Sequence, residues 1–182
     1  MLGIRYSALE QRIRRKEEEI RRQTFESAFA WDAQGNPVLA KDGLKAKISF
    51  TPEETARLAN TVFTHNHPRG LEYEENDPRS VGDSFSMQDV SFACVNNLAE
   101  IRAVTPKLCF LLKRPVSGWN AEVWANVIYP VYYEVRLDVV ADLSAACRAE
   151  ILTSEAADAS FMHEIWRRVA EKLGLDYRRG NV

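Results

Sequence analysis

Two histidines of this 182-residue chain lie in one tripeptide, His65-Asn66-His67, which is followed by Pro68. Residues 61–65 have the composition of a strand, and alternate residues of a strand point to the same side. The two imidazoles can therefore converge on one point. Imidazole nitrogens suit zinc, which they bind at about 2.0–2.1 Å. The tripeptide thus predicts two ligands of a metal site, although it could also form a turn with solvent-facing rings.

A third ligand is available in Asp89, in the first turn of a helix expected from Ser86 to about Glu100. A catalytic zinc needs three protein ligands and one position for water. Ser86 would place a hydroxyl beside that site. Ser86-x-x-Asp89 also has the form of a capping box, in which the serine caps the helix and the acid returns a hydrogen bond. The two interpretations are compatible, because a cap fixes the geometry that a ligand needs.

The order of these features resembles the signature of the JAMM (MPN+) metallopeptidases: a strand, His-x-His-Pro, a spacer, and Ser-x-x-Asp. Residues 64–70, Thr-His-Asn-His-Pro-Arg-Gly, are especially similar to the bacterial RadC-type branch. They also resemble JAMM-type domains of phage head-morphogenesis (MuF-like) and polymorphic-toxin proteins. The resemblance covers about residues 24–115. The spacer before Ser86 is longer than is usual in the family, because residues 71–83 are inserted or expanded.

The resemblance implies a zinc-dependent peptidase or isopeptidase that hydrolyses an amide bond in a protein or peptide substrate. It places Zn²⁺ on His65, His67 and Asp89. Since a structural zinc site is normally closed by four protein ligands, three ligands favour catalysis. The alternative is a phage- or toxin-associated protein-binding module with a structural or vestigial metal site.

Two further residues receive catalytic roles from the resemblance. Glu26, in a predicted strand over 24–31, holds the place of the family's glutamate, which takes a proton from water and later gives it to the leaving amine. Ser86 would donate a hydrogen bond to the oxyanion. Without the histidines, Glu26 would be interpreted as a partly exposed strand residue in a salt bridge.

Three other patterns suggest chemistry less strongly. His-Asn-His matches a nuclease name, but those nucleases spread the three residues over a ββ-metal-α unit. Met162-His163-Glu164 begins like His-Glu-x-x-His, yet Arg167 replaces the second ligand, so His163 is expected on a helix surface or interface. Aromatic side chains in the C-terminal third are expected to pack in the core rather than to contact a partner. These are Trp119, Trp124, Tyr129, Tyr132 and Tyr133.

Composition limits the functional classes. Twenty-four basic and 26 acidic residues give a net charge of −2, which offers no support for binding nucleic acid or anionic lipid. The sequence contains no apolar run of the roughly 18–20 residues that a membrane span needs, and no secretory segment is expected. Three widely spaced cysteines suit neither a disulfide framework nor a Cys-x-x-Cys site. A reduced, cytoplasmic protein is expected.

The predicted fold class is α/β (α+β), a mixed sheet flanked by helices; the resemblance makes it MPN-like, a three-layer arrangement similar to that of cytidine deaminases. A solvated N-terminal helical arm (1–23) precedes the domain 24–115, and a C-terminal helical extension (116–182) packs on it and could support homo-oligomers. The tail 177–182 is expected to fray, and 69–84 is expected to be a long loop. Strands are predicted over 24–31, 38–40, 44–50, 61–65, 101–105 and 108–112. Helices are predicted over 6–23, 52–60 and 87–100, with two or three more between 120 and 175.

Overall fold

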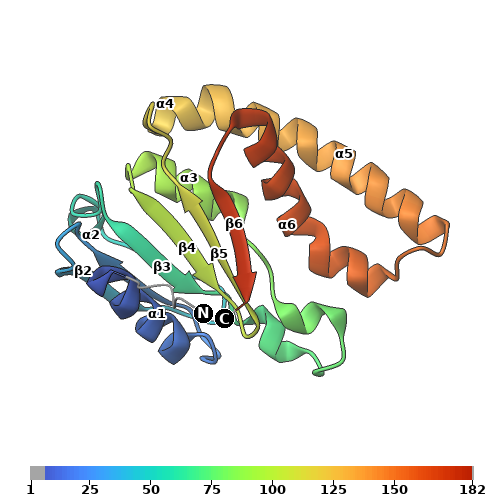
Figure 1. Cartoon of the computed structure of the whole chain (residues 1–182), viewed down its shortest axis with the longest axis horizontal. Coiled ribbons are helices and arrows are strands. Elements are labelled where there is room, and N and C mark those ends of the chain that lie inside the picture. The colour runs from blue at the N-terminus through green and yellow to red at the C-terminus, as the bar shows by residue number, and fades with distance from the viewer. Residues whose placement is uncertain (1–6, 182) are drawn as a thin grey trace, which may run out of the picture.

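A six-stranded mixed sheet forms the centre of the molecule, in the strand order β2-β1-β3-β4-β5-β6 (Figure 1). The computed structural model describes residues 7–181, so residues 1–6 of the predicted arm and Val182 of the predicted tail lie outside it. Neighbouring strands are antiparallel, except for the parallel pair β3 and β4. The predicted mixed α/β class is confirmed. The strands are β1 (Ser27–Trp31), β2 (Pro37–Asp42), β3 (Val62–Asn66), β4 (Glu100–Val104), β5 (Leu108–Lys113) and β6 (Tyr177–Asn181).

Helices cover both faces of the sheet. Thr51 caps the start of α2: its hydroxyl accepts a hydrogen bond from the Glu54 amide, and the Glu54 carboxylate accepts one from the Thr51 amide. The predicted C-terminal helices are also present. The helices are α1 (Ala8–Ile20), α2 (Pro52–Thr55), α3 (Met87–Val95), α4 (Ala121–Val123), α5 (Tyr129–Arg148) and α6 (Ser154–Leu173). Shorter turns are the 3₁₀-helices η1 (Pro68–Glu72) and η2 (Pro78–Val81) and the π-helical turn η3 (Trp124–Ile128).

Successive side chains of β3 point to opposite faces of the sheet. Thr64 faces α1, because its hydroxyl donates to Glu17 at 3.0 Å. Phe63 faces α3, because its ring lies 5.3 Å from that of Phe92. His65, two residues after Phe63, therefore shares the α3 face, and this face carries the candidate site.

The N-terminal helix is not the solvated arm that was predicted. Ile13 and Ile20 are buried against the sheet, and Glu17 is only 5% exposed. Glu17 accepts hydrogen bonds from Arg102 of β4, a buried cation that also contacts Glu10 and Glu100. Few residues of this helix are apolar, but it still packs on the sheet. Its isoleucines meet an apolar surface, and Glu17 pairs with the buried charge of Arg102.

The predicted strand over 44–50 is wrong. Leu44 and Lys47 form an isolated bridge, and residues 44–50 form no strand. Gly43 permits this tight turn, since a Cβ there would lie 2.5 Å from the carbonyl oxygen of Lys47. The alternation at the end of this segment reflects packing without sheet pairing, because Ile48 and Phe50 lie partly buried against the core while Ser49 is exposed.

Other predicted boundaries also change. The helix predicted to reach Glu100 ends at Val95, and Asn97 after it has a positive φ of 51°. The loop 69–84 contains η1 and η2. The tail that was expected to fray forms β6, which pairs along β5 from Leu112↔Tyr177 to Leu108↔Asn181. Its polar sequence gives no strand pattern because it lies at an edge of the sheet.

Candidate metal centre

Both histidines lie at the carboxyl end of β3, one on either side of a buried asparagine. Asn66 accepts the backbone amide of Ser27 at 2.6 Å and donates to the carbonyl of Phe25 at 2.9 Å. These bonds hold the chain on both sides of Glu26. The residue between the two histidines therefore fixes the position of the predicted catalytic glutamate relative to them.

The imidazoles and the Asp89 carboxylate converge, as predicted. His65 Nε2 lies 2.9 Å from His67 Nε2 and 3.3 Å from Asp89 Oδ1, and His67 Nε2 lies 3.4 Å from Asp89 Oδ2. Tetrahedral zinc with bonds of 2.0–2.1 Å separates its ligand atoms by about 3.3–3.4 Å. Two imidazole nitrogens at 2.9 Å also need a proton or a cation between them. Zinc fits this donor set, with two nitrogens and one carboxylate oxygen.

Asp89 and Ser86 form the predicted capping box at the start of α3. The Ser86 amide donates to Asp89 Oδ2 at 2.6 Å, and the Ser86 hydroxyl accepts the Asp89 amide at 3.2 Å. The cap thus fixes the carboxylate while Asp89 Oδ1 faces His65. The hydroxyl accepts in this cap, which leaves its own proton available for donation.

The two imidazoles have different environments on their far sides. His67 Nδ1 lies 3.0 Å from the carbonyl oxygen of Asp83, so it carries a proton and leaves Nε2 able to bind a metal. Arg69 steadies Asp83 through an ion pair of 2.7 Å. His65 Nδ1 is buried and has no hydrogen-bond partner within residues 7–181. The role of the Asp83 carbonyl could not be predicted from the sequence, because any residue type can supply a main-chain carbonyl.

The charges in the cluster reinforce one another. Burial alone would lower the pKa of His67, but the hydrogen bond and charge of Asp89 raise it to about 9. Burial would raise the pKa of Asp89, but the two imidazoles hold it well below its usual range. Burial raises the pKa of Glu26 above its ordinary value, against the opposing effect of the histidines. Glu26 therefore has a proton affinity shifted in the direction that a general base requires.

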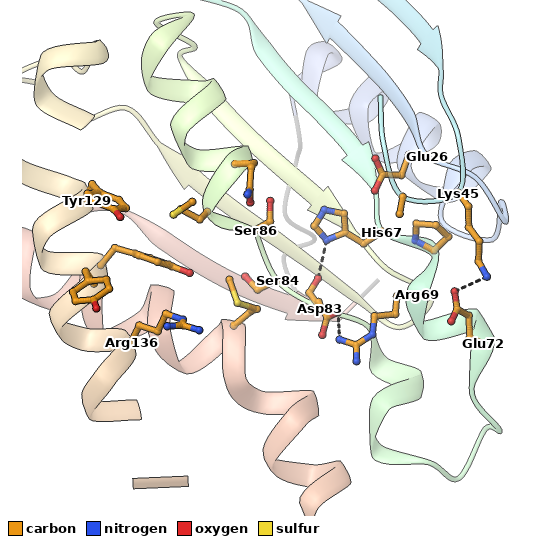
Figure 2. Close-up of a pocket in the computed structure, with 17 residues that line it drawn as sticks. Glu26, Lys45, His67, Arg69, Glu72, Asp83, Ser84, Ser86, Tyr129 and Arg136 are labelled. Atoms are coloured by element: carbon orange, nitrogen blue, oxygen red, sulfur yellow. Dashed lines mark hydrogen bonds and ion pairs between the residues drawn. The ribbon is translucent and has the colours of Figure 1, made fainter. Parts of the chain in front are cut away.

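Glu26 lines two cavities, each of which is also lined by residues of the cluster. The strand predicted over 24–31 begins only at Ser27, so Glu26 lies directly before β1. A cleft of about 810 Å³ is lined by Glu26, His67 and Ser86 (Figure 2). A smaller cavity of about 190 Å³ is lined by Glu26, His65 and Asp89. The five residues singled out from the sequence therefore surround one location.

The segment that carries Asp83 and Ser86 is held by the C-terminal elements. Trp166 Nε1 donates to the carbonyl of Phe85 at 2.7 Å. The Tyr177 hydroxyl lies 2.8 Å from Ser84 Oγ and 2.9 Å from His163 Nδ1. His163 is thus a partly buried residue with an internal contact, which corrects its predicted place on a helix surface or interface.

Comparisons with protein-family models, with curated proteins and with solved structures found no match to this chain. Among the described helices, none combines the length and the apolar character needed to cross a membrane.

Proposed function

We propose that the chain is a zinc-dependent hydrolase of JAMM type with an MPN-like fold, which cleaves an amide bond in a protein or peptide substrate in the cytoplasm. One observation carries the proposal: His65, His67 and Asp89 converge at zinc-ligand spacing while Glu26 faces the same centre. The sequence resemblance supports the same chemistry independently of the distances.

His65, His67 and Asp89 would hold the ion. Bound zinc would supply Lewis acidity and lower the pKa of a water molecule towards about 7. The Asp83 carbonyl keeps His67 in the tautomer that a ligand needs, and the cap at Ser86 keeps Asp89 in place. Two of the three ligand side chains, His67 and Asp89, are thus oriented by groups around them.

Glu26 would transfer the proton, and Ser86 would stabilise the developing negative charge. The Glu26 carboxylate takes a proton from the attacking water and returns it to the leaving amine. The Ser86 hydroxyl donates a hydrogen bond to the substrate's carbonyl oxygen as negative charge develops on it. Both groups line the large cleft, from which a peptide would approach.

The proposal is tested with the Glu26→Gln protein, zinc analysis and a pool of internally quenched peptides. Glu26→Gln should retain one zinc per chain and lose hydrolysis by a factor of about 10² or more. Glu72→Gln is a matched control, because Glu72 lines the same cleft and forms an exposed ion pair with Lys45. It should keep both zinc and hydrolysis.

Two results would overturn the assignment. Loss of zinc from Glu26→Gln would make Glu26 a ligand, which favours a closed structural site in a protein-binding module. Hydrolysis at the wild-type rate in Glu26→Gln would remove its role as the base.

A further inference from the structure

The large cleft extends from the metal centre to helix α5, which lies outside the JAMM-like segment. Figure 2 shows Arg136 and Tyr129 on the α5 side of the cleft and His67 and Glu26 on the other side. Tyr132 and Tyr133 also line it. A molecule held by α5 can therefore reach the reactive centre.

Arg136 of α5 lacks the ion pairs that the cations in the second half of α6 form. Arg167, Arg168 and Lys172 each contact an acid at 2.6–2.7 Å. Arg136 has no hydrogen bond or ion pair within residues 7–181. Its neighbours three and four positions away along α5 are tyrosine and valine, namely Tyr132, Tyr133, Val139 and Val140.

Tyr132, one turn before Arg136, supplies a second unused polar group. The residue is only 6% exposed, and its ring lies 5.1 Å from that of Trp166. Most of the residue is buried, but its hydroxyl oxygen reaches the surface, and it has no hydrogen-bond partner in the described part of the chain. Since Tyr132 lines the cleft, this hydroxyl is available to a ligand there.

The other charges of the cleft are already neutralised. Arg69 pairs with Asp83 and Asp158, and Lys45 pairs with Glu72. Among the charged residues that line the cleft away from the metal centre, Arg136 is thus the one left to pair with an anionic group of a ligand. One guanidinium fork beside one hydroxyl suits a carboxylate, which accepts two parallel hydrogen bonds from arginine.

We infer that Arg136 and Tyr132 form a carboxylate-binding subsite for the substrate. The carboxylate belongs to an aspartate or glutamate side chain or to the end of a chain. The identification of its bearer as a substrate peptide rests on the proposed hydrolase function. A cleft of about 810 Å³ lies in the range of sites that enclose small ligands, so it accommodates a short segment of a peptide.

The test measures binding without hydrolysis, by fluorescence anisotropy in a chelating buffer. The probes are fluorescein-labelled, C-terminally amidated alanine-tyrosine hexapeptides in which one glutamate is scanned along the chain. Each peptide is also made with glutamine or lysine in place of the glutamate. The glutamine peptides are made a second time with a free C-terminal carboxylate. The free C-terminus distinguishes a terminal carboxylate from a side-chain carboxylate.

The wild-type protein should bind its best carboxylate probe about tenfold more tightly than the neutral analogue, as expected for a charge-assisted hydrogen-bonded pair. Arg136→Gln should abolish this preference, Arg136→Glu should reverse it towards the lysine probe, and Tyr132→Phe should weaken it. Arg148→Gln is the matched control, because Arg148 is exposed about 18 Å further along the same helix. It should leave the preference unchanged.

Equal binding of carboxylate and neutral probes to the wild type, or no binding of either, would overturn the subsite. So would a carboxylate preference that persists in Arg136→Gln. Binding that depends on Arg136 without any hydrolysis of the quenched peptides would keep the subsite and remove the hydrolase. If hydrolysis depends on Glu26 but the carboxylate preference does not depend on Arg136, the hydrolase assignment stands and the subsite is removed.

Discussion

At the residue scale, Ser86 has two tasks that a single experiment can separate. Its hydroxyl caps α3 by accepting the Asp89 amide, and in the proposed mechanism it donates to the substrate's carbonyl oxygen. Thr153 caps α6 in the same way, by accepting the Ala156 amide at 3.2 Å, but it does not line the cleft.

Replacing each cap by alanine should give equal losses of stability and unequal losses of activity. Ser86→Ala and Thr153→Ala should each lower the free energy of unfolding by about 1 kcal/mol in urea titrations. Ser86→Ala should also reduce peptide hydrolysis by about 10²-fold or more, as for loss of one oxyanion donor. If both variants hydrolyse at the wild-type rate, Ser86 is a cap and has no part in catalysis.

The pKa of His67 predicts a pH dependence of stability in the metal-free protein. Its folded pKa of about 9 exceeds the unperturbed value near 6.5. The stabilisation is therefore complete below pH 6.5 and is lost as the pH rises through 9. The free energy of unfolding in chelating buffer should fall by up to about 3 kcal/mol over that range.

Asp89→Asn provides the control for this pH profile, because Asp89 supplies the hydrogen bond and charge that raise the pKa. The variant should show a nearly flat profile between pH 6.5 and 9 in urea titrations. An equally steep profile in Asp89→Asn would show that another group titrates.

The site's reactive side chains could be predicted from the sequence, whereas the groups that orient them could not. The two histidines, Ser86 and Asp89 have characteristic types in a characteristic order. Asn66 and the Asp83 carbonyl act through hydrogen bonds between a side chain and a main-chain group that lie 39 and 16 residues apart. Such contacts depend on the folded path of the chain and leave no local pattern.

At the scale of elements, the segment from Gly82 to Ser86 depends on α6 and β6. Tyr177 of β6 joins Ser84 to His163, and Trp166 of α6 holds Phe85. This segment presents the carbonyl that orients His67. The last part of the chain therefore acts on the metal centre through a hydrogen-bonded loop.

Tyr177→Phe should loosen this segment while keeping the aromatic ring. The change leaves Ser84 and His163 without their shared partner, at a cost of about 1–3 kcal/mol in stability. We expect zinc to bind several-fold more weakly in competition with a chelating dye. Tyr133→Phe, at an exposed position of α5, should change neither property. Unaltered zinc affinity in Tyr177→Phe would show that the segment keeps its position without β6.

Strong local patterns predicted elements well, and weak ones did not. The strands near 61–65, 101–105 and 108–112 shift by one residue at most at their ends, since apolar residues pack on the core. β6 has the sequence Tyr-Arg-Arg-Gly-Asn, and pairing with β5 makes it a strand. Residues 44–50 show the opposite case, because Ile48 and Phe50 alternate by packing on the core without pairing in a sheet.

At the scale of the whole molecule, one hydrophobic cluster joins the JAMM-like segment to the C-terminal part. Phe85 and Phe110 belong to the same cluster as Tyr132, Ile165 and Trp166. The predicted boundary at residue 115 therefore passes through a shared core.

A fragment that ends at residue 115 should fail to fold by itself. It lacks α5, α6 and β6, so it exposes the apolar face that these elements cover. We expect no cooperative transition in thermal unfolding and no tight zinc binding, while the full chain shows both. A cooperative transition in the fragment would establish residues 24–115 as an independent domain.

In the proposed metal centre, three side chains bind one zinc ion and leave a position open beside Glu26. Diffraction data from zinc-loaded crystals, collected on both sides of the zinc absorption edge, would locate the ion and its ligands. We predict one anomalous peak at about 2.0–2.2 Å from His65 Nε2, His67 Nε2 and an Asp89 oxygen, with Glu26 outside ligand distance. A peak elsewhere, no peak, or a peak that includes Glu26 as a fourth ligand would contradict the account.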